Sequence, residues 1–503
     1  MALAIVKSRA HVGIDAPLVT VEVHLSAGLP GLSIVGLPET AVRESKDRVR
    51  SAIINSRFDF PAQRITINLA PADLPKHGSR FDLAIALGIL AASEQIEVDA
   101  LEDKEFIAEL ALDGKLRAVT GILPASIASK HQERHLLVAT GNAKEASLSD
   151  HPHLYAAEHL LGICGHLNKE IPIAPSRHLK QSFTPPAQPD LADVQGQSLA
   201  RRALEIAAAG RHSLLFIGPP GTGKTMLASR LPSISPDLND EQAIAVAAVH
   251  SIAGKSMDLE RWQQPCFRAP HHTASAVALV GGGNPPKPGE ISLAHEGILF
   301  LDELPEFDRK VLEVLREPLE TGTISISRAS HQITYPANFQ FIAAMNPCPC
   351  GYLGDPHKSC GFTCEKAIRY RGKLSGPLLD RIDLQVEVPP INLHELTGHT
   401  PITLSQENSS TVKLRAIKAR NLQLARAGKL NSQLTQPEIK QYCSPDEKDI
   451  AMLTQTIDKL GLSARAYFRI LKVARTIADL AGKESIETEH WLEAVNYRIL
   501  DRQ

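Results

Sequence analysis

Residues 214–225 of this 503-residue chain read LLFIGPPGTGKT. Four apolar residues, the pattern of a short buried strand, run directly into a glycine-rich turn, and a helical pattern follows. In such a turn backbone N–H groups face phosphate oxygens, and the N-terminus of the helix adds its positive dipole end. The alternative is a turn used only for packing. We predict a phosphate-binding loop formed by Gly218, Pro219, Pro220, Gly221, Thr222, Gly223, Lys224 and Thr225.

A second apolar segment, residues 298–301, ends in Asp302 and Glu303. An acidic pair at the end of a buried strand is costly unless it has a chemical role, although an exposed strand end is the alternative. We predict that Lys224 reaches the β- and γ-phosphates of ATP, that Thr225 supplies a hydroxyl to Mg²⁺ and that Asp302 holds this Mg²⁺ through water. Glu303 would polarise the attacking water. Together the two motifs predict an ATPase.

Two polar residues further along the chain complete this prediction. An apolar strand at residues 339–344 ends near Asn346, where an amide can help to orient the water, and Arg381 lies within LLDRID. An arginine in that setting is predicted to act as a finger for the nucleotide of a neighbouring subunit, because its cationic fork offsets charge in the transition state. Taken singly, each is more often a surface or paired residue. Their order along the chain favours catalysis.

The chain is longer than one compact domain, and two stretches rich in proline and polar residues divide it. The division predicts an α+β domain at 1–173, an α/β core at 191–390 and a helical domain at 412–503, joined by linkers at 174–190 and 391–411. We expect strands at residues 18–25, 65–69, 214–217, 298–301 and 339–343, and helices at residues 81–92, 463–480 and 489–500. Ser463 is the expected N-cap of the second of these helices.

The composition excludes some classes of protein. Hydrophobic residues make up 43% and charged residues 22%, which is typical of a globular chain and not of a disordered one. The net charge of −2 argues against a uniformly basic nucleic-acid coat but leaves room for a local basic channel. No apolar stretch approaches the roughly 20 residues that span a bilayer, and no secretory signal is evident. We expect a cytoplasmic protein with no membrane partner.

Four of the seven cysteines lie in a Cys-rich insertion at residues 346–366. Their spacing, C-x-C-x9-C-x3-C, would let four thiolates surround one tetrahedral Zn²⁺ without leaving an open position, which predicts a structural zinc site. The first pair is closer than the common C-x2-C spacing, and His357 is an alternative ligand. The predicted ligands are Cys348, Cys350, Cys360 and Cys364. The other cysteines, Cys164, Cys266 and Cys443, are expected in the core.

Two segments are candidates for contact with DNA. Residues 323–334 alternate apolar and polar side chains around a central tip, which predicts a hairpin, and residues 366–373 are the basic run KAIRYRGK. Such cations contact phosphates without reading sequence, and solvated surface is the alternative. The predicted contacts are Arg328, His331, Lys366, Arg369, Arg371 and Lys373. A further basic run at 413–429 is expected to form a helix face that covers the ring or a neighbour, and His271 and His272 are expected to pack.

These motifs together resemble those of the AAA+ ATPases, and more narrowly the magnesium-chelatase-like group. The narrower resemblance is carried by RAPHHT at 268–273, GGG at 281–283, PGEISLAH at 288–295, LSARA at 462–466 and VARTIADL at 473–480. The whole chain is similar to the ComM (YifB) family. This resemblance implies a hexameric ATPase ring that migrates branched DNA and helps single strands to integrate by homologous recombination in natural transformation. It also implies that Arg465 is the sensor-2 arginine of a helical lid and that the 323–334 hairpin faces the pore.

The resemblance also implies a ribosomal-S5/Lon-protease-like fold for the N-terminal domain. Aligned on the Lon-type proteases, the catalytic serine position falls on Arg80 and the later lysine position falls near Pro124. Ser79 and Lys76 lie close by, so a shifted dyad remains an alternative, although a serine is inert without a base within hydrogen-bond reach. We predict a non-proteolytic domain for DNA binding or assembly. The alternative functions are a chelatase-type or protein-remodelling motor and, with less support, a Lon-like ATP-dependent protease.

Overall fold

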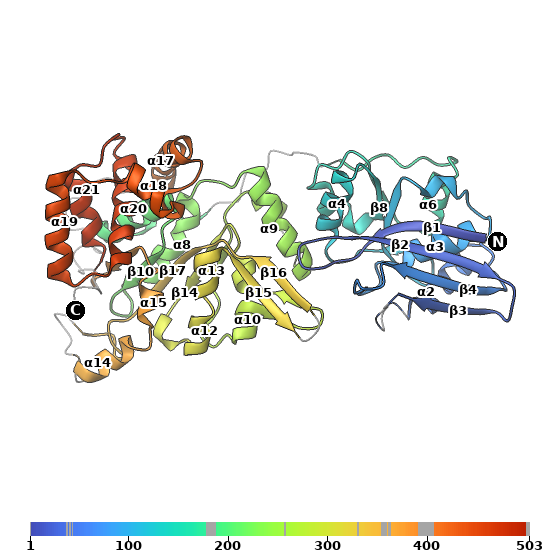
Figure 1. Cartoon of the computed structure of the whole chain (residues 1–503), viewed down its shortest axis with the longest axis horizontal. Coiled ribbons are helices and arrows are strands. Elements are labelled where there is room, and N and C mark those ends of the chain that lie inside the picture. The colour runs from blue at the N-terminus through green and yellow to red at the C-terminus, as the bar shows by residue number, and fades with distance from the viewer. Residues whose placement is uncertain are drawn as a thin grey trace.

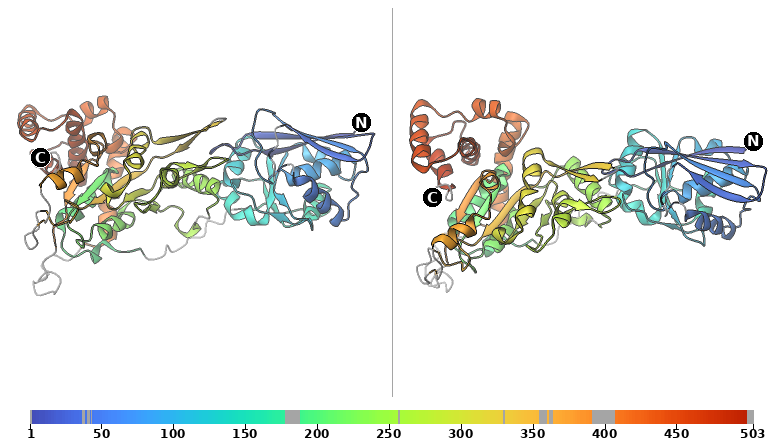
Figure 2. Two further views of the ribbon diagram at one scale, coloured as in Figure 1. Left: turned by 90° about the horizontal axis from the view of Figure 1, so that it is seen from below. Right: turned by 60° about the horizontal axis from the view of Figure 1, so that its bottom comes forward.

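The computed structural model describes residues 2–36, 39, 42, 44–177, 188–255, 258–328, 331–353, 360, 364–390 and 407–498. Three blocks follow one another along an elongated molecule, with the N-terminal domain at one end, the α/β core in the middle and the helical domain at the other end (Figures 1 and 2). Among the described residues, no helix has the length and apolar character that a membrane crossing requires.

The N-terminal domain is built on a seven-stranded mixed sheet with the order β3-β4-β2-β1-β5-β8-β9. Alternate residues of β2 point into the core, as its period-2 pattern predicts. Helix α3 is buried along its whole length, because every residue after its first aspartate is apolar or glycine, and it packs on β1 and β2. The strands are β1 (Ala2–Arg9), β2 (Leu18–Ser26), β3 (Gly31–Val35), β4 (Arg64–Ala70), β5 (Lys104–Ile107), β6 (Glu109–Leu110), β7 (Leu116–Arg117), β8 (His135–Ala139) and β9 (Leu154–Ala157). The helices are α2 (Ser45–Asn55), α3 (Asp82–Ala92), α4 (Ile122–His131), α5 (Ala143–Ser147) and α6 (Leu160–Leu167).

The core is a parallel five-stranded sheet with the order β11-β14-β17-β10-β18. Helices cover it, so β10, β14 and β17 are buried throughout, which explains their continuous apolar sequences. The strands are β10 (Leu214–Ile217), β11 (Phe267–Arg268), β14 (Ile298–Leu301), β17 (Gln340–Met345) and β18 (Leu384–Glu387). The expected bounds of β10 and β14 are confirmed, β17 begins one residue later than expected, and β11 and β18 were not expected. The α/β fold class is confirmed.

Short elements decorate this core. Strands β15 and β16 form the expected hairpin, which points toward the N-terminal domain (Figure 1). The remaining strands and helices of this block are β12 (Gly281–Gly282), β13 (Lys287–Pro288), β15 (Thr323–Arg328), β16 (His331–Pro336), α7 (Ser198–Gly210), α8 (Lys224–Ile234), α9 (Asp240–Ala253), α10 (Ala276–Val280), α11 (Glu290–Leu293), α12 (Arg309–Glu313), α13 (Arg316–Thr321), α14 (Cys364–Arg371) and α15 (Gly376–Leu379).

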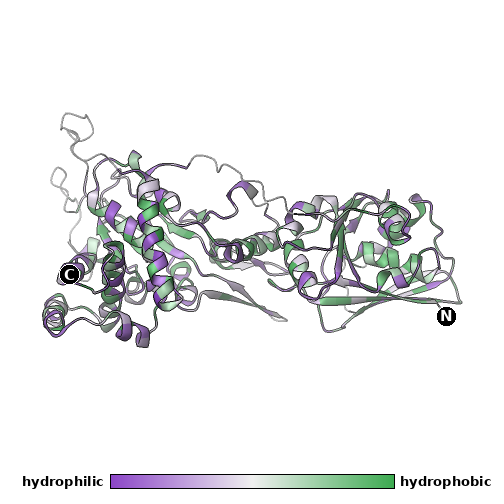
Figure 3. Cartoon of the chain, turned by 90° about the horizontal axis from the view of Figure 1, so that it is seen from above, coloured by the Kyte–Doolittle hydropathy of each residue, from purple (hydrophilic) through white to green (hydrophobic). Residues whose placement is uncertain are grey.

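The described part of the C-terminal domain, residues 407–498, is helical and contributes no strand to a sheet. Its helices are α17 (Ser409–Ala427), α18 (Gln436–Tyr442), α19 (Glu447–Leu460), α20 (Ala464–Leu480) and α21 (Thr488–Asn496). The Ser463 side chain accepts from Ala466 N at 3.2 Å, so the predicted N-cap of α20 is confirmed. The helices alternate between hydrophilic and hydrophobic residues, as expected where only one side is buried (Figure 3). The basic face of α17 covers the core of its own chain, with Lys413 paired to Asp237 and Arg415 to Glu205.

The N-terminal domain and the core meet at α4 and α9. Leu123 and Leu148 pack against Ala247 and Ala248 in one small apolar cluster. The backbone is engaged as well, because Gly121 N donates to the carbonyl oxygen of Ser251 at 3.1 Å. A cavity of about 460 Å³ lies beside this contact, lined from both domains. The two domains are therefore docked through packed side chains and a main-chain hydrogen bond.

Candidate ATP site

The glycine-rich loop connects β10, in the middle region of the sheet, to the N-terminus of α8. Gly221 and Gly223 have φ values of +82° and +86°, a left-handed conformation that glycine adopts at little cost. A Cβ on Gly218 would lie 2.2 Å from the carbonyl oxygen of Val388, so the start of the loop can sit against the end of β18 only as glycine. These conformations open the loop ahead of α8.

Lys224 extends back through this loop. Its Nζ donates to the carbonyl oxygens of Gly218 and Pro219, both at 2.8 Å, and to Oδ1 of Asn346 at 3.2 Å. Burial lowers the pKa of Lys224, and the carboxylates of Asp302 and Glu303 oppose that shift. The predicted contribution of Asn346 to this site is therefore matched by its position, since β17 ends beside the lysine.

Thr225 and Asp302 face one another across the site. Thr225 Oγ1 donates to Oδ2 of Asp302 at 2.5 Å, and the backbone N–H of Glu303 donates to Oδ1 of the same carboxylate at 2.9 Å. A hydroxyl and a carboxylate oxygen are the kind of ligands that fit Mg²⁺, which prefers oxygen and keeps several waters. Mg²⁺ bound there would neutralise phosphate charge.

Glu303 follows with a side chain that is 51% exposed and a backbone φ of +53°. The left-handed conformation is uncommon for a residue other than glycine and occurs often at active sites. His272 contacts this carboxylate, with 3.1 Å between His272 Nδ1 and Glu303 Oε2, and its ring lies 4.1 Å from that of His271. The expectation that His272 only packs is therefore wrong.

The sequence contains one signal that could have found His272. It follows β11, and β11 pairs with β14 in parallel, so the carboxyl ends of both strands open on the same edge of the sheet. That argument needs β11 to be recognised as a strand, and two residues carry no periodicity. The contact joins positions 31 apart in sequence, and no local pattern links them.

The two remaining predicted arginines occupy different environments. Arg381 has a side chain only 7% exposed, is ion-paired with Glu320 of α13 and donates to the carbonyl oxygen of Pro377. Arg465 is exposed at the start of α20 and makes no hydrogen bond or ion pair with the part of the chain that the structure describes. One arginine is thus held within its own subunit, and the other is available to an anion.

Three of the predicted zinc ligands come together. The Sγ atoms of Cys348, Cys350 and Cys360 lie 3.3, 3.4 and 3.7 Å from one another. Thiolates bound to one Zn²⁺ at about 2.3 Å are separated by roughly 3.8 Å in a tetrahedral site, so the arrangement fits that ion. The backbone N–H of Leu353 donates to Sγ of Cys348 at 3.3 Å. The side chain of Cys364 and all of His357 lie outside the described residues.

The Cys loop lies against the phosphate loop. Cys348 follows Asn346 by two residues, and Gly351, with φ +85°, is so close to Pro220 that a Cβ would lie 2.5 Å from its Cδ. Arg371 of α14 donates to the carbonyl oxygen of Pro347 at 3.2 Å and so supports the same loop. Cys164 and Cys443 are buried, as expected for core residues. Cys266, which was also expected in the core, is only partly buried.

The candidate DNA contacts are placed as follows. The hairpin that carries Arg328 and His331 is formed, but the side chains of these two residues lie outside the described part of the chain. On α14 and the turn after it, Arg369 is exposed and near Glu365 across one helical turn, while Lys373 pairs with Glu306 at 3.4 Å. Lys366 is exposed. The basic run is therefore at the surface, partly engaged by carboxylates.

The Lon-like alternative depends on a serine and a base in contact. Ser79 Oγ instead donates to the carboxylate of Glu109, and Lys76 Nζ donates to the carbonyl oxygen of Pro71. Arg80 is buried, donates to the carbonyl oxygens of Arg9 and Thr120, and has its pKa lowered by burial to about 10. This geometry pairs Ser79 with an acceptor and Lys76 with a carbonyl, which does not support a shifted dyad.

Comparison with known proteins agrees with the site. Three family models match: subunit ChlI of Mg-chelatase over residues 21–142, magnesium chelatase, subunit ChlI, over 190–396, and magnesium chelatase, subunit ChlI C-terminal, over 406–498. Competence protein ComM of Haemophilus influenzae is 52% identical over 100% of this chain and 98% of its own length, and YifB of Escherichia coli is 49% identical over the same shares. The magnesium-chelatase 67 kDa subunit of Chlorobaculum parvum is 23% identical over 40% of this chain and 26% of its own. With the nucleotide loop, acidic strand end and lid assembled as described, the chain belongs to the ComM (YifB) family of magnesium-chelatase-like AAA+ proteins.

Proposed function

We propose that the protein is an ATP-dependent DNA motor that works in the cytoplasm as a hexameric ring. Its task would be to migrate branched DNA and so to promote integration of single strands by homologous recombination during natural transformation. The observation that carries the proposal is the convergence of Lys224, Thr225, Asp302, Glu303 and Asn346 at one edge of the sheet. This convergence occurs in a chain that is 52% identical, over its whole length, to a competence protein.

The chemical roles follow from the positions of these groups. Lys224 and the loop N–H groups would hold the β- and γ-phosphates, and Thr225 and Asp302 would hold the Mg²⁺ that neutralises their charge. Glu303 would accept a proton from the attacking water once its carboxylate leaves His272. Asn346, which already contacts Lys224, would help to orient that water.

In a ring, the two arginines would act on the nucleotides of two different subunits. Arg465 would bind the nucleotide of its own subunit, because it is exposed at the start of the lid helix α20 and has no partner among the described residues. Arg381 would reach the nucleotide of the next subunit, where its fork would offset charge in the transition state. For that it must leave Glu320.

DNA would run past the β15–β16 hairpin and the basic surface of α14. The hairpin projects from the core, and Lys366, Arg369, Arg371 and Lys373 would meet phosphates without reading base sequence. Because such contacts release counterions, DNA affinity should fall steeply with salt.

ATP turnover with and without DNA tests the proposal. Purified protein would be assayed alone and with single-stranded, duplex and four-way-junction DNA, with Glu303→Gln as the blank. Stimulation by DNA that is greatest on the junction supports the motor. ATP turnover that is the same with and without each DNA would overturn the proposal and favour a protein-remodelling or chelatase-type role. The similarity with the 67 kDa chelatase subunit would then support the chelatase-type role. Casein cleavage that requires ATP and Ser79 would revive the Lon-like alternative.

We also propose that the Cys cluster holds one structural Zn²⁺. The three described sulfur atoms lie within 3.7 Å of one another, and Cys364 would supply the fourth ligand. Elemental analysis should find about one zinc per chain in the native protein. Cys350→Ser should lose it, whereas Cys443→Ser, at a buried cysteine far from the cluster in sequence, should retain it. Native protein with well under one metal per chain would refute the assignment.

A further inference from the structure

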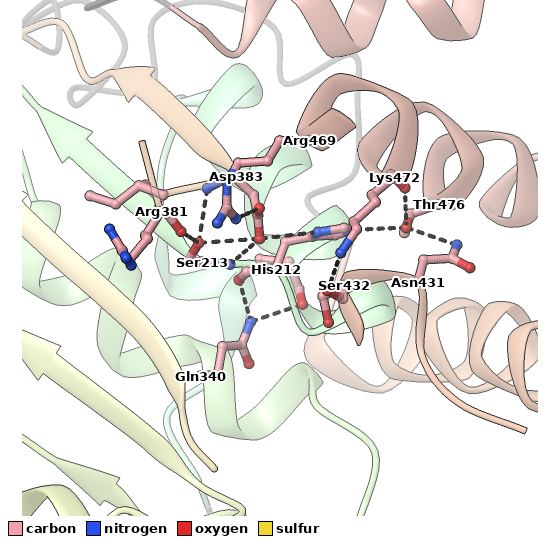
Figure 4. Close-up of polar contacts among 12 residues, drawn as sticks. His212, Ser213, Gln340, Arg381, Asp383, Asn431, Ser432, Arg469, Lys472 and Thr476 are labelled. Carbon is pink, nitrogen blue, oxygen red and sulfur yellow. Dashed lines mark hydrogen bonds and ion pairs between the residues drawn. The ribbon is translucent and has the colours of Figure 1, made fainter. Parts of the chain in front are cut away.

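A buried polar cluster joins the AAA+ core to the lid (Figure 4). At its centre is Asp383, 5% exposed, which directly precedes β18. Its Oδ2 accepts from the backbone N–H of Ser213 at 3.0 Å and from Nδ1 of His212 at 3.3 Å, and its Oδ1 accepts from Arg469 of α20. Burial opposes ionisation of Asp383, but Arg469 and His212 outweigh it and lower its pKa far below the ordinary value.

Ser213 ties this cluster to the segment that carries the finger. Its Oγ donates to the carbonyl oxygen of Arg381 at 3.0 Å and accepts from the backbone N–H of Asp383 at 2.8 Å. Ser213 directly precedes β10, and the phosphate loop follows the other end of that strand. The backbone of residues 381–383 is therefore fixed to the strand that positions the nucleotide.

His212 ties the same cluster to the lid. Its ring is fully buried, and Nε2 is 2.7 Å from Oγ1 of Thr476 on α20. Asn431 Nδ2 donates to the same Thr476 oxygen at 3.0 Å, so the contact belongs to the packed body of the lid. On the core side, Gln340 Nε2 donates to the carbonyl oxygen of His212 at 2.9 Å. Each ring nitrogen of His212 therefore has a partner, Asp383 on the core side and Thr476 on the lid, and the backbone of His212 is fixed to the core.

Helix α20 connects this cluster to the nucleotide-reading arginine. Arg469 lies one helical turn after Arg465, so the two side chains project from one side of the same helix. A helix of 17 residues moves as a rigid element, and a buried, charge-paired cluster is costly to break at one point. A displacement of α20 would therefore be passed to Asp383 and to the backbone of Arg381.

We propose that Asp383 and Arg469 couple ATP binding in one subunit to ATP hydrolysis in the next. They would link the lid, which contacts ATP through Arg465, to Arg381, which the same subunit presents to its neighbour. The inference rests on the proposed ring. When Arg465 engages the nucleotide, α20 shifts, Arg469 and His212 carry the shift to residues 381–383, and Arg381 is released from Glu320. Asp383 and Arg469 are positioning residues, since neither touches the nucleotide.

Arg469→Ala tests the coupling through a split between binding and turnover. A fluorescent ATP analogue should bind within about threefold of wild type, because the loop and Arg465 are intact, while kcat falls about tenfold and the Hill coefficient for ATP drops toward 1. Arg469→Lys should restore part of the rate. The matched control is Arg202→Ala, which removes another ion pair between core and lid, Arg202 Nε to Glu493 Oε1 at 2.9 Å, without touching the cluster.

A double-mutant cycle decides whether Arg469 acts through Arg381. If it does, Arg469→Ala should cause little further loss of kcat in an Arg381→Ala background. Multiplying effects, or an equal loss in Arg202→Ala, would overturn the proposal. Thermal melting checks that the variants fold. Thr476→Val, which removes the contacts of the Thr476 hydroxyl with His212 and Asn431 but leaves the Asp383–Arg469 pair in place, gives an independent variant if Arg469→Ala does not fold. All of these assays run without DNA, so failure of the DNA-motor proposal would leave their reading unchanged.

Discussion

Two buried lysines, Lys224 in the core and Lys76 in the N-terminal domain, show why similar groups have different prospects for chemistry. Burial lowers the pKa of both, and a carboxylate lies near each. Lys224 faces Asn346, and the Thr225–Asp302 pair lies beside it in an open glycine loop. Lys76 is bound to a backbone carbonyl, and its neighbour Ser79 is bound to Glu109.

The difference lies in convergence. In the core, side chains from three separate strands and a helix meet at one edge of a parallel sheet, where the carboxyl ends of the strands open together. In the N-terminal domain, the buried guanidinium of Arg80 occupies the position where the protease resemblance would place a serine, and Ser79 and Lys76 each have a separate local partner.

The largest expected effect comes from substituting each of the two lysines in turn. Lys224→Ala should weaken ATP binding by about 100-fold, because the cation at the β- and γ-phosphates is lost. Lys76→Met should leave ATP binding and kcat near wild type and act only on the stability of the N-terminal domain. Isothermal titration with a non-hydrolysable ATP analogue measures the first effect and thermal melting the second. Equal losses of ATP binding in both variants would remove the distinction between the two sites.

A smaller effect is expected from acid, which should lower the stability of the N-terminal domain. Burial lowers the pKa of His151 in the N-terminal domain from 6.5 to about 4, so the neutral form is favoured in the folded state. Its contribution is fully present above pH 6.5 and is lost as the pH falls toward 4, which costs about 2 kcal/mol between pH 7 and pH 5. Denaturant unfolding across this range measures it. His151→Gln should reduce the dependence but not abolish it, because burial also lowers the pKa of His11 to about 4, whereas His131→Gln, at an exposed histidine of the same domain, should leave it unchanged.

Asp82 works in the opposite direction in the same domain. Burial raises its pKa to about 6 despite the ion pair with Arg48. A carboxyl whose folded pKa is raised adds stability at low pH, and that stability is lost as the pH rises from about 4 to about 6. The His151 effect is therefore best read as the difference between the His151→Gln variant and wild type. A difference of zero would contradict the assignment.

An intermediate effect is expected at His272. Its contact with Glu303 engages the carboxylate that we propose as the proton acceptor, so His272→Ala should raise basal turnover by about threefold. His271→Ala, at the stacked neighbour, should change turnover less. A steady-state assay without DNA measures both. A lower rate in His272→Ala would mean that His272 holds Glu303 in its productive position.

The smallest effect is expected at Ser79. Its hydroxyl is bound to Glu109, and Lys76, the base of the alternative dyad, is bound to a backbone carbonyl instead, so Ser79→Ala should alter neither ATP turnover nor casein integrity, with changes below about 1.5-fold. The assay pairs ATP turnover with gel analysis of casein. Loss of a protease activity in this variant would show that the N-terminal domain does chemistry that its resting geometry hides.

The sequence predicts those features that depend on neighbours along the chain. The bounds of β10 and β14 and the Ser463 cap follow from apolar runs flanked by glycine or a capping serine. The meeting of Cys348, Cys350 and Cys360 follows from close spacing. Lys224 beside Asn346 also follows, because parallel strands open at one edge.

The remaining features depend on tertiary contacts that leave no pattern. Arg381 was correctly placed in an apolar setting, but its partner Glu320 lies on a helix with no sequence relation to it. The Asp383 cluster draws residues from the segments just before β18 and β10 and from α20. A strand as short as β11 has no period to detect, so the contact between His272 and Glu303 was also hidden. Polar groups that pair across long distances in sequence can be identified only from the three-dimensional structure.

The docking of α4 on α9 has a practical consequence for anyone who divides this protein. The covalent seam lies in residues 174–190, yet the physical seam lies at Leu123 and Ala247, with Gly121 bonded to Ser251. A cut in the linker would leave an apolar patch and unpaired main-chain groups on both fragments. Such fragments should adhere to each other or aggregate, so co-expressed halves are a better starting material than either half alone.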